Sequence, residues 1–79
     1  MDMETYVAHL NREEIRLFLP IRVWLCRFLV APTAKRYEEF LKMFVDCDEW
    51  TDYVPMVCIV NPDEFQLFAY YMMNRLRNY

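Results

Sequence analysis

The chain has 79 residues, contains no glycine or serine, and carries a formal net charge of −3. Without glycine it has no glycine-rich loop to hold a phosphate, and without serine it has neither a Ser–His–Asp triad nor a nucleophile elbow. A chain this short forms a single domain, residues 1–79, and buries only about 60% of the surface that its unfolded form exposes. Because 57% of its residues are hydrophobic, we expect some large apolar side chains to stay on the surface, where a contiguous patch marks an interaction site.

The first predicted element is a short amphipathic helix over residues 3–10, in which four apolar residues recur at helical spacing. Asn11 follows this helix, and Glu14 stands three residues later, which is the spacing of a capping box. We therefore expect one or two further helical turns after Asn11, ending near Pro20.

Residues 21–30 fit either a strand or a helix. Apolar residues alternate with other residues over 15–25, as in a strand. A helix with Pro20 in its first position also fits, because one face of it would carry Ile21, Trp24, Leu25, Phe28 and Leu29. Residues 54–60, VPMVCIV, have no polar side chain and the length of a buried strand. Since a buried strand must pair its backbone groups, we predict that 21–30 is its partner strand.

An amphipathic helix is predicted over residues 34–47, between the two strand-like runs. Thr33 precedes it as an N-cap, and most charged residues lie opposite its apolar stripe. The stripe consists of Tyr37, Phe40, Leu41, Phe44 and Val45. Strand, helix and strand in this order predict a right-handed crossover. The predicted fold is a helix-rich α+β domain with strands at about 21–30 and 54–60, and the alternative is a small all-α bundle.

A long helix is predicted over residues 62–77. Asn61 is its N-cap, Pro62 takes its first position, and Glu64 completes a second capping box. One stripe of this helix suits the core and consists of Phe65, Phe68, Ala69, Met72 and Leu76. The apolar residues left over are Leu67, Tyr70, Tyr71 and Met73. Because so small a globule covers only one side of the helix, these residues predict a protein-binding surface.

No catalytic, cofactor or metal site is predicted. The three cysteines, Cys26, Cys47 and Cys58, lack the number and spacing of a disulfide framework or a metal knuckle. The acidic segment 46–52, DCDEWTD, lacks the glycine and the glutamate that an EF-hand requires. His9, the one histidine, has an acidic neighbour one turn away, a pair typical of a solvated helix surface. We therefore expect no enzymatic activity.

The sequence also predicts a cytoplasmic protein. The N-terminus is acidic and polar, unlike a signal peptide. The most apolar run, residues 17–31, is interrupted by Arg22 and Arg27 and is too short for a membrane span. We expect no transmembrane segment and, if the chain is viral, a location in the host cytoplasm.

Charge is distributed unevenly along the chain. Residues 11–36 carry six basic and two acidic residues, a net charge of +4, whereas residues 37–64 carry one basic and eight acidic residues, a net charge of −7. Such asymmetry favours oriented association with a charged partner or with a second copy.

The predicted function is that of a small non-enzymatic protein-binding module. Its expected binding residues are Leu67, Tyr70, Tyr71, Met73, Asp46, Asp48, Glu49, Trp50 and Asp52. The expected partner is a second copy, giving a homodimer, or a larger host protein. By analogy, small single domains without catalytic groups are common among phage and virus accessory inhibitors, including those of the anti-CRISPR type.

Two other functions stay open. Basic residues interleaved with Trp24 and Phe28 suit a small nucleic-acid-binding protein, although the negative net charge disfavours it. Its binding residues would be Arg16, Arg22, Arg27, Lys35 and Arg36. The second alternative is a structural subunit of a larger assembly.

Overall fold

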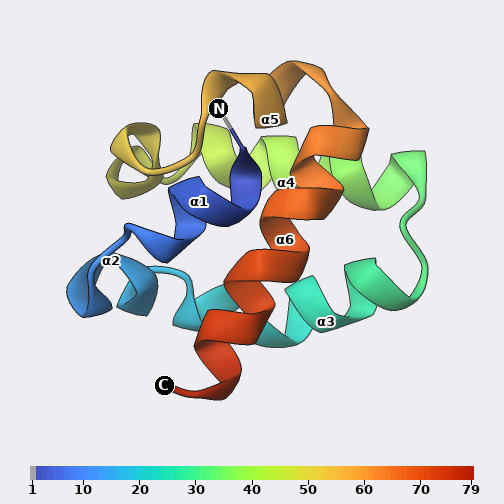
Figure 1. Cartoon of the computed structure of the whole chain (residues 1–79). Coiled ribbons are helices and arrows are strands. Elements are labelled where there is room, and N and C mark those ends of the chain that lie inside the picture. Colours follow the sequence, from blue (N-terminus) through green and yellow to red (C-terminus); the bar gives the residue numbers. More distant parts are fainter. Residues whose placement is uncertain (1) are drawn as a thin grey trace.

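The computed structural model describes residues 2–79, and all regular structure in that range is helical (Figure 1). The α-helices are α1 (Met3–Ala8), α2 (Arg12–Arg16), α3 (Arg22–Val30), α4 (Ala34–Val45), α5 (Met56–Val60) and α6 (Pro62–Arg77), and the 3-10 helices are η1 (Leu19–Ile21) and η2 (Asp48–Asp52). They pack into a body of 29 × 24 × 23 Å. Every helix in the described range is too short or too polar to span a lipid bilayer.

The predicted α+β fold is wrong, and the alternative, a small all-α bundle, matches the observed architecture. Residues 21–30, expected to be a strand, end η1 and form α3. The buried residues of this segment are Ile21, Leu25 and Phe28, and their spacing of four and three is helical. A strand of period two would have buried Val23 with Leu25, but Val23 is exposed. The alternation of apolar residues therefore did not indicate a strand with one buried and one exposed face.

The second predicted strand, residues 54–60, is also helical and contains α5. Only Val54 and Cys58 of its seven residues are buried. The lack of polar side chains therefore did not indicate burial on both faces. With no strand in residues 2–79 to pair with, the segment satisfies its backbone groups within a helical turn.

The two predicted N-caps that precede α2 and α4 are confirmed. The Asn11 side chain accepts a hydrogen bond from the Glu14 N–H at 2.9 Å, and the Glu14 carboxylate accepts one from the Asn11 N–H at 2.7 Å. The Thr33 hydroxyl oxygen accepts from the Arg36 N–H at 3.2 Å. These bonds satisfy amide groups that have no partner inside the helix.

The capping box predicted at α6 forms only in part. Asn61 does cap the helix, because its side chain accepts from the Asp63 N–H at 3.0 Å. Glu64 does not complete the box, because the Asn61 N–H already donates to the Val57 carbonyl oxygen at 3.0 Å. Asn61 therefore closes α5 and opens α6 with no linker between the two helices.

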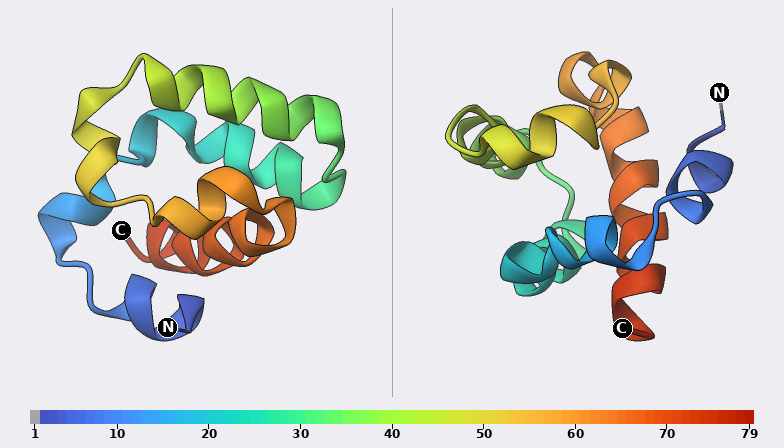
Figure 2. Two further views of the ribbon diagram at one scale, coloured as in Figure 1. Left: turned by 90° about the horizontal axis from the view of Figure 1, so that it is seen from above. Right: turned by 90° about the vertical axis from the view of Figure 1, so that its left-hand side faces the viewer.

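Helix α6 is the central element, since α1, α2, α3 and α5 all pack against it (Figure 2). Its predicted core stripe is buried throughout and consists of Phe65, Phe68, Ala69, Met72 and Leu76. The Phe65 ring stacks on Phe40 with 4.1 Å between ring centroids and meets Phe28 edge to face at 5.0 Å. Such aromatic pairs contribute about 0.5–1.5 kcal/mol each beyond their burial. A neighbouring face of α6 is covered less completely, and the candidate site lies there.

Candidate docking site

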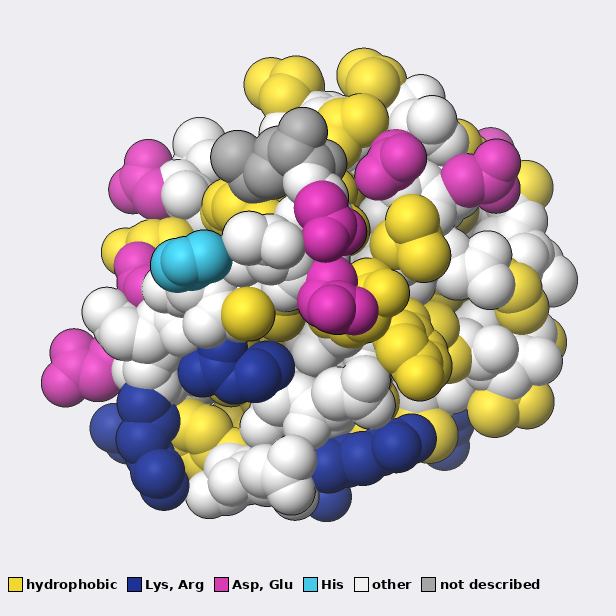
Figure 3. Space-filling view, in the orientation of Figure 1, with side chains coloured by type: hydrophobic (Ala, Val, Ile, Leu, Met, Phe, Trp, Pro, Cys, Tyr) yellow, Lys and Arg dark blue, Asp and Glu magenta, His cyan; other side chains and the backbone are white. Residues whose placement is uncertain are grey.

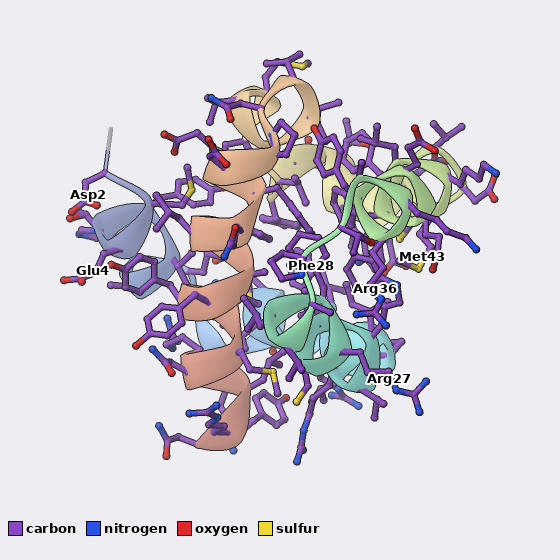
Figure 4. The ribbon with its side chains drawn as sticks, turned by 90° about the vertical axis from the view of Figure 1, so that its right-hand side faces the viewer. Asp2, Glu4, Arg27, Phe28, Arg36 and Met43 are labelled. Carbon is purple, nitrogen blue, oxygen red and sulfur yellow. The ribbon has the colours of Figure 1, made fainter. Side chains whose placement is uncertain are left out.

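A groove of about 740 Å³ lies between α3 and α6, on the side of the molecule that Figure 4 faces. Its apolar lining comes from both helices and includes Cys26, Leu29, Val30, Leu67, Tyr70 and Met73. Asp63 and Arg77 also line it, near the two ends of α6. They are fourteen positions apart, which is about 21 Å along a helix. We call this hollow the α3–α6 groove.

The groove exists because α3 and α6 are each apolar on two neighbouring faces. Helix α6 turns its core stripe inward, and Leu67 and Tyr70 lie on the next face, where they are 46% and 52% exposed. On α3, Phe28 points toward the interior (Figure 4), whereas Val30 is 82% exposed. Large apolar side chains from two helices therefore meet at one hollow that is open to solvent.

Two aromatic side chains stand at the α6 rim of the groove. The rings of Tyr70 and Tyr71 meet edge to face, with centroids 5.2 Å apart and an interplanar angle of 79°. Tyr71 is half-buried, and burial followed by the negative charge of Glu4 raises the pKa of its hydroxyl above 10.0. Because a tyrosine has few rotamers to lose on binding, Tyr70 is well suited to anchor a partner.

Two of the predicted binding residues are much less accessible than expected. Met73 is only 6% exposed and forms part of the groove lining. Trp50 is 4% exposed, because its indole N–H donates to the Leu17 carbonyl oxygen at 3.2 Å and its ring stacks on Phe18 at 5.5 Å. Trp50 is therefore a core residue that joins η2 to the N-terminal half, and little of its surface is open to a partner.

The acidic residues predicted to join this interface lie elsewhere. Asp46, Asp48, Glu49 and Asp52 are all exposed. They follow the C-terminal end of α4, on the left of Figure 1, whereas the C-terminal end of α3, which carries Val30, lies on the right. The structure does not bring the acidic segment and the α3–α6 groove together.

The α3 wall of the groove was missed by the sequence analysis. Cys26, Leu29 and Val30 follow i, i+3, i+4 spacing, which places them on one face of a helix. That signal is present in the sequence, but the strand assignment of 21–30 separated these residues onto two faces. A second set of exposed apolar residues, Met56, Val57 and Val60, lies on α5. It belongs to one five-residue helix and so offers a smaller surface than the groove.

The basic residues predicted for nucleic-acid binding have different roles. The guanidinium of Arg36 donates to the carbonyl oxygens of Arg27 and Ala31, at 3.0 and 2.9 Å, and so closes the C-terminal end of α3. The other four, Arg16, Arg22, Arg27 and Lys35, are exposed. Figure 3 shows basic side chains gathered along the lower edge, over α2, α3 and the end of α6, with acidic side chains mainly above them. One of the five is therefore committed to the fold, and four are available at the surface.

The groups considered for chemistry are poorly placed for it. Burial, and then the negative charge of Glu64, raises the pKa of the Cys58 thiol to about 12, which disfavours the nucleophilic thiolate. His9 is exposed, and its Nδ1 lies 2.7 Å from the carbonyl oxygen of Thr5. Within residues 2–79, no three or more His, Cys, Asp or Glu side chains come together in a way that could hold a metal ion.

Comparisons with known proteins add no relative. No protein-family model matches the chain. Searches of curated proteins and of solved structures also found no match. The function of the molecule therefore has to be inferred from its own surface.

Proposed function

We propose that this chain is a non-enzymatic protein-binding module that uses the α3–α6 groove as its docking site. The observation that carries the proposal is the exposure of Val30, Leu67 and Tyr70, large apolar side chains from two helices that share one hollow. Fully burying one such side chain is worth about 1.5–3 kcal/mol. A partner that covers all three therefore gains several kcal/mol before the costs of association.

The shape of the groove favours a helical partner. A hollow between two helices accepts the apolar face of a third helix, with anchors spaced by three or four residues. Tyrosine and methionine are also enriched at protein interfaces relative to other surfaces. If the partner is a larger host protein, the bound chain blocks the surface that it covers, as a small accessory inhibitor does.

The test compares three tagged forms of the chain as baits: unchanged, Tyr70→Glu and Val45→Glu. Val45 is the matched control, because it is a 76% exposed apolar residue on α4 and does not line the groove. Bound proteins from an extract of the source organism, including untagged copies of this chain, are quantified by mass spectrometry. We expect the unchanged and Val45→Glu baits to bind the same protein and the Tyr70→Glu bait to lose it at least roughly tenfold, since a carboxylate cannot be buried unpaired. Equal binding by all three baits, or none by any, would refute the proposal.

Nucleic-acid binding is the second candidate, and the exposed arginines along α2 and α3 favour it. Such binding depends on the release of counterions and weakens steeply as salt rises. Anisotropy of a labelled generic duplex, measured between low and physiological salt, tests this function. Salt-sensitive binding that Arg22→Glu and Arg27→Glu abolish would support it, and an unchanged signal on adding protein at low salt would exclude it.

A further inference from the structure

We infer that the occupant of the α3–α6 groove is a second copy of this chain, docked about a twofold axis with the two α6 helices antiparallel and Tyr70 next to the axis. This inference rests on the function proposed above, because it names the partner of the same site. The observation behind it is the order of side chains along the α6 wall.

The groove-lining residues of α6 are self-complementary when the helix is reversed. In an antiparallel pair, residues at equal distances on either side of the centre face each other. With Tyr70 at the centre, Asp63 of one copy faces Arg77 of the other, seven residues away on each side. Leu67 faces Met73 in the same register, three residues away on each side, where Met73 forms the floor of the groove with only 6% of its surface exposed. One rotation therefore pairs charge with opposite charge and apolar residue with apolar residue, as an isologous contact requires.

The alternative direction does not have this property. In a parallel pair, Asp63 would face Asp63 and Arg77 would face Arg77, so that like charges meet at both ends. The helix dipoles add to the difference, since Asp63 lies at the positive end of α6 and Arg77 at the negative end. An antiparallel pair places opposite ends next to each other. Charge therefore selects both the direction and the register of the second copy.

The α3 wall provides the other half of the contact. Val30 is 82% exposed on this wall, and Leu29 is half-buried beside it. The Tyr70 and Leu67 side chains of the second copy would fill the hollow in front of them, and the twofold axis repeats the same contact on the other side. Because only one face of two helices per copy takes part, we expect a weak dimer that dissociates on dilution.

The test is a charge exchange followed by sedimentation velocity, with a reducing agent present so that the exposed Cys26 thiol does not link copies. Asp63→Arg gives a groove with two positive ends, and Arg77→Asp gives one with two negative ends. We expect each variant alone to dimerise at least roughly tenfold more weakly than the unchanged chain, because like charges then face each other. An equimolar mixture of the two variants, and the double variant D63R/R77D, should recover the dimer. Circular dichroism checks that each variant is folded.

The outcomes separate this inference from the proposed function. A chain that stays monomeric at every concentration up to about the millimolar range, where even a very weak contact would appear, overturns the dimer. The proposed function then survives if Tyr70→Glu still loses a captured protein that Val45→Glu retains. A dimer whose single variants are weakened, with a mixture no stronger than either, overturns the antiparallel register. A dimer that the single variants, their mixture and the double variant all leave intact forms through another surface and overturns this inference.

Discussion

Helix α6 has two apolar faces, and the fold treats them differently. The inner face, with Phe65 and Leu76, is buried in the core, and α1, α2, α3 and α5 pack against the helix. The groove face, with Leu67 and Tyr70, has similar side chains but is about half exposed. Composition alone does not separate these roles. Position on the helix relative to its neighbours decides whether an apolar residue stabilises the monomer or is available to a partner.

The largest expected contrast between core and groove concerns two thiols. Cys58 is fully buried and has a pKa raised to about 12, whereas Cys26 is exposed in the groove. At the low stability expected for a domain of this size, about 5 kcal/mol, the core opens rarely. Cys58 should therefore react with a thiol reagent on the order of a thousandfold more slowly than Cys26. Labelling followed by peptide mass spectrometry measures both rates. Similar rates would mean that the core is not closed around Cys58.

A matched pair of leucines on α6 tests the two faces directly. Leu76→Ala, on the inner face, should lower the free energy of unfolding by about 2–5 kcal/mol, because it leaves a cavity in the core. Leu67→Ala, on the groove face, should change it by less than about 0.5 kcal/mol, because the side chain is already half exposed. Urea denaturation of both variants gives the comparison. Comparable losses for the two leucines would show that the groove face stabilises the monomer.

A smaller effect is expected at the start of the helix, where both faces begin. Asn61→Ala removes the side-chain oxygen that accepts from the Asp63 N–H, at a cost of about 1 kcal/mol. The Asn61 N–H bond to Val57 does not depend on the side chain, so α5 should stay in place. Denaturation midpoints measure the loss, and Thr33→Ala at α4 is the control for an ordinary cap. A loss several times larger at Asn61 would mean that α5 and α6 separate.

The local features of this fold were readable from the sequence. The caps of α2 and α4 and the core stripe of α6 depend on residues three or four apart, and all of them form. The capping box predicted at Glu64 does not form, for an equally local reason: the Asn61 N–H donates to the Val57 carbonyl oxygen at the end of α5. The capping pattern of α6 does not reveal that α5 ends at the same residue.

The other errors concern contacts between distant segments. Residues 21–30 and 54–60 could form strands only if they paired with each other. Instead each forms a helix, α3 and α5, that packs against α6. The burial of Trp50 depends on the carbonyl of Leu17, 33 residues earlier. The α6 side of the groove was found because it needed only helical spacing and the small size of the chain. The α3 side was not predicted, because a strand over 21–30 places its groove residues on two different faces.

The central position of α6 has a consequence for synthesis of the chain. Helices α1, α2, α3 and α5 all precede α6 in the chain, and α6 is the main packing partner of each. As the nascent polypeptide leaves the ribosome, these segments have no common surface to assemble on until residues 62–77 emerge. Their aromatic side chains stay accessible to chaperones and proteases during that interval, and folding then proceeds around the element that was made last among its partners.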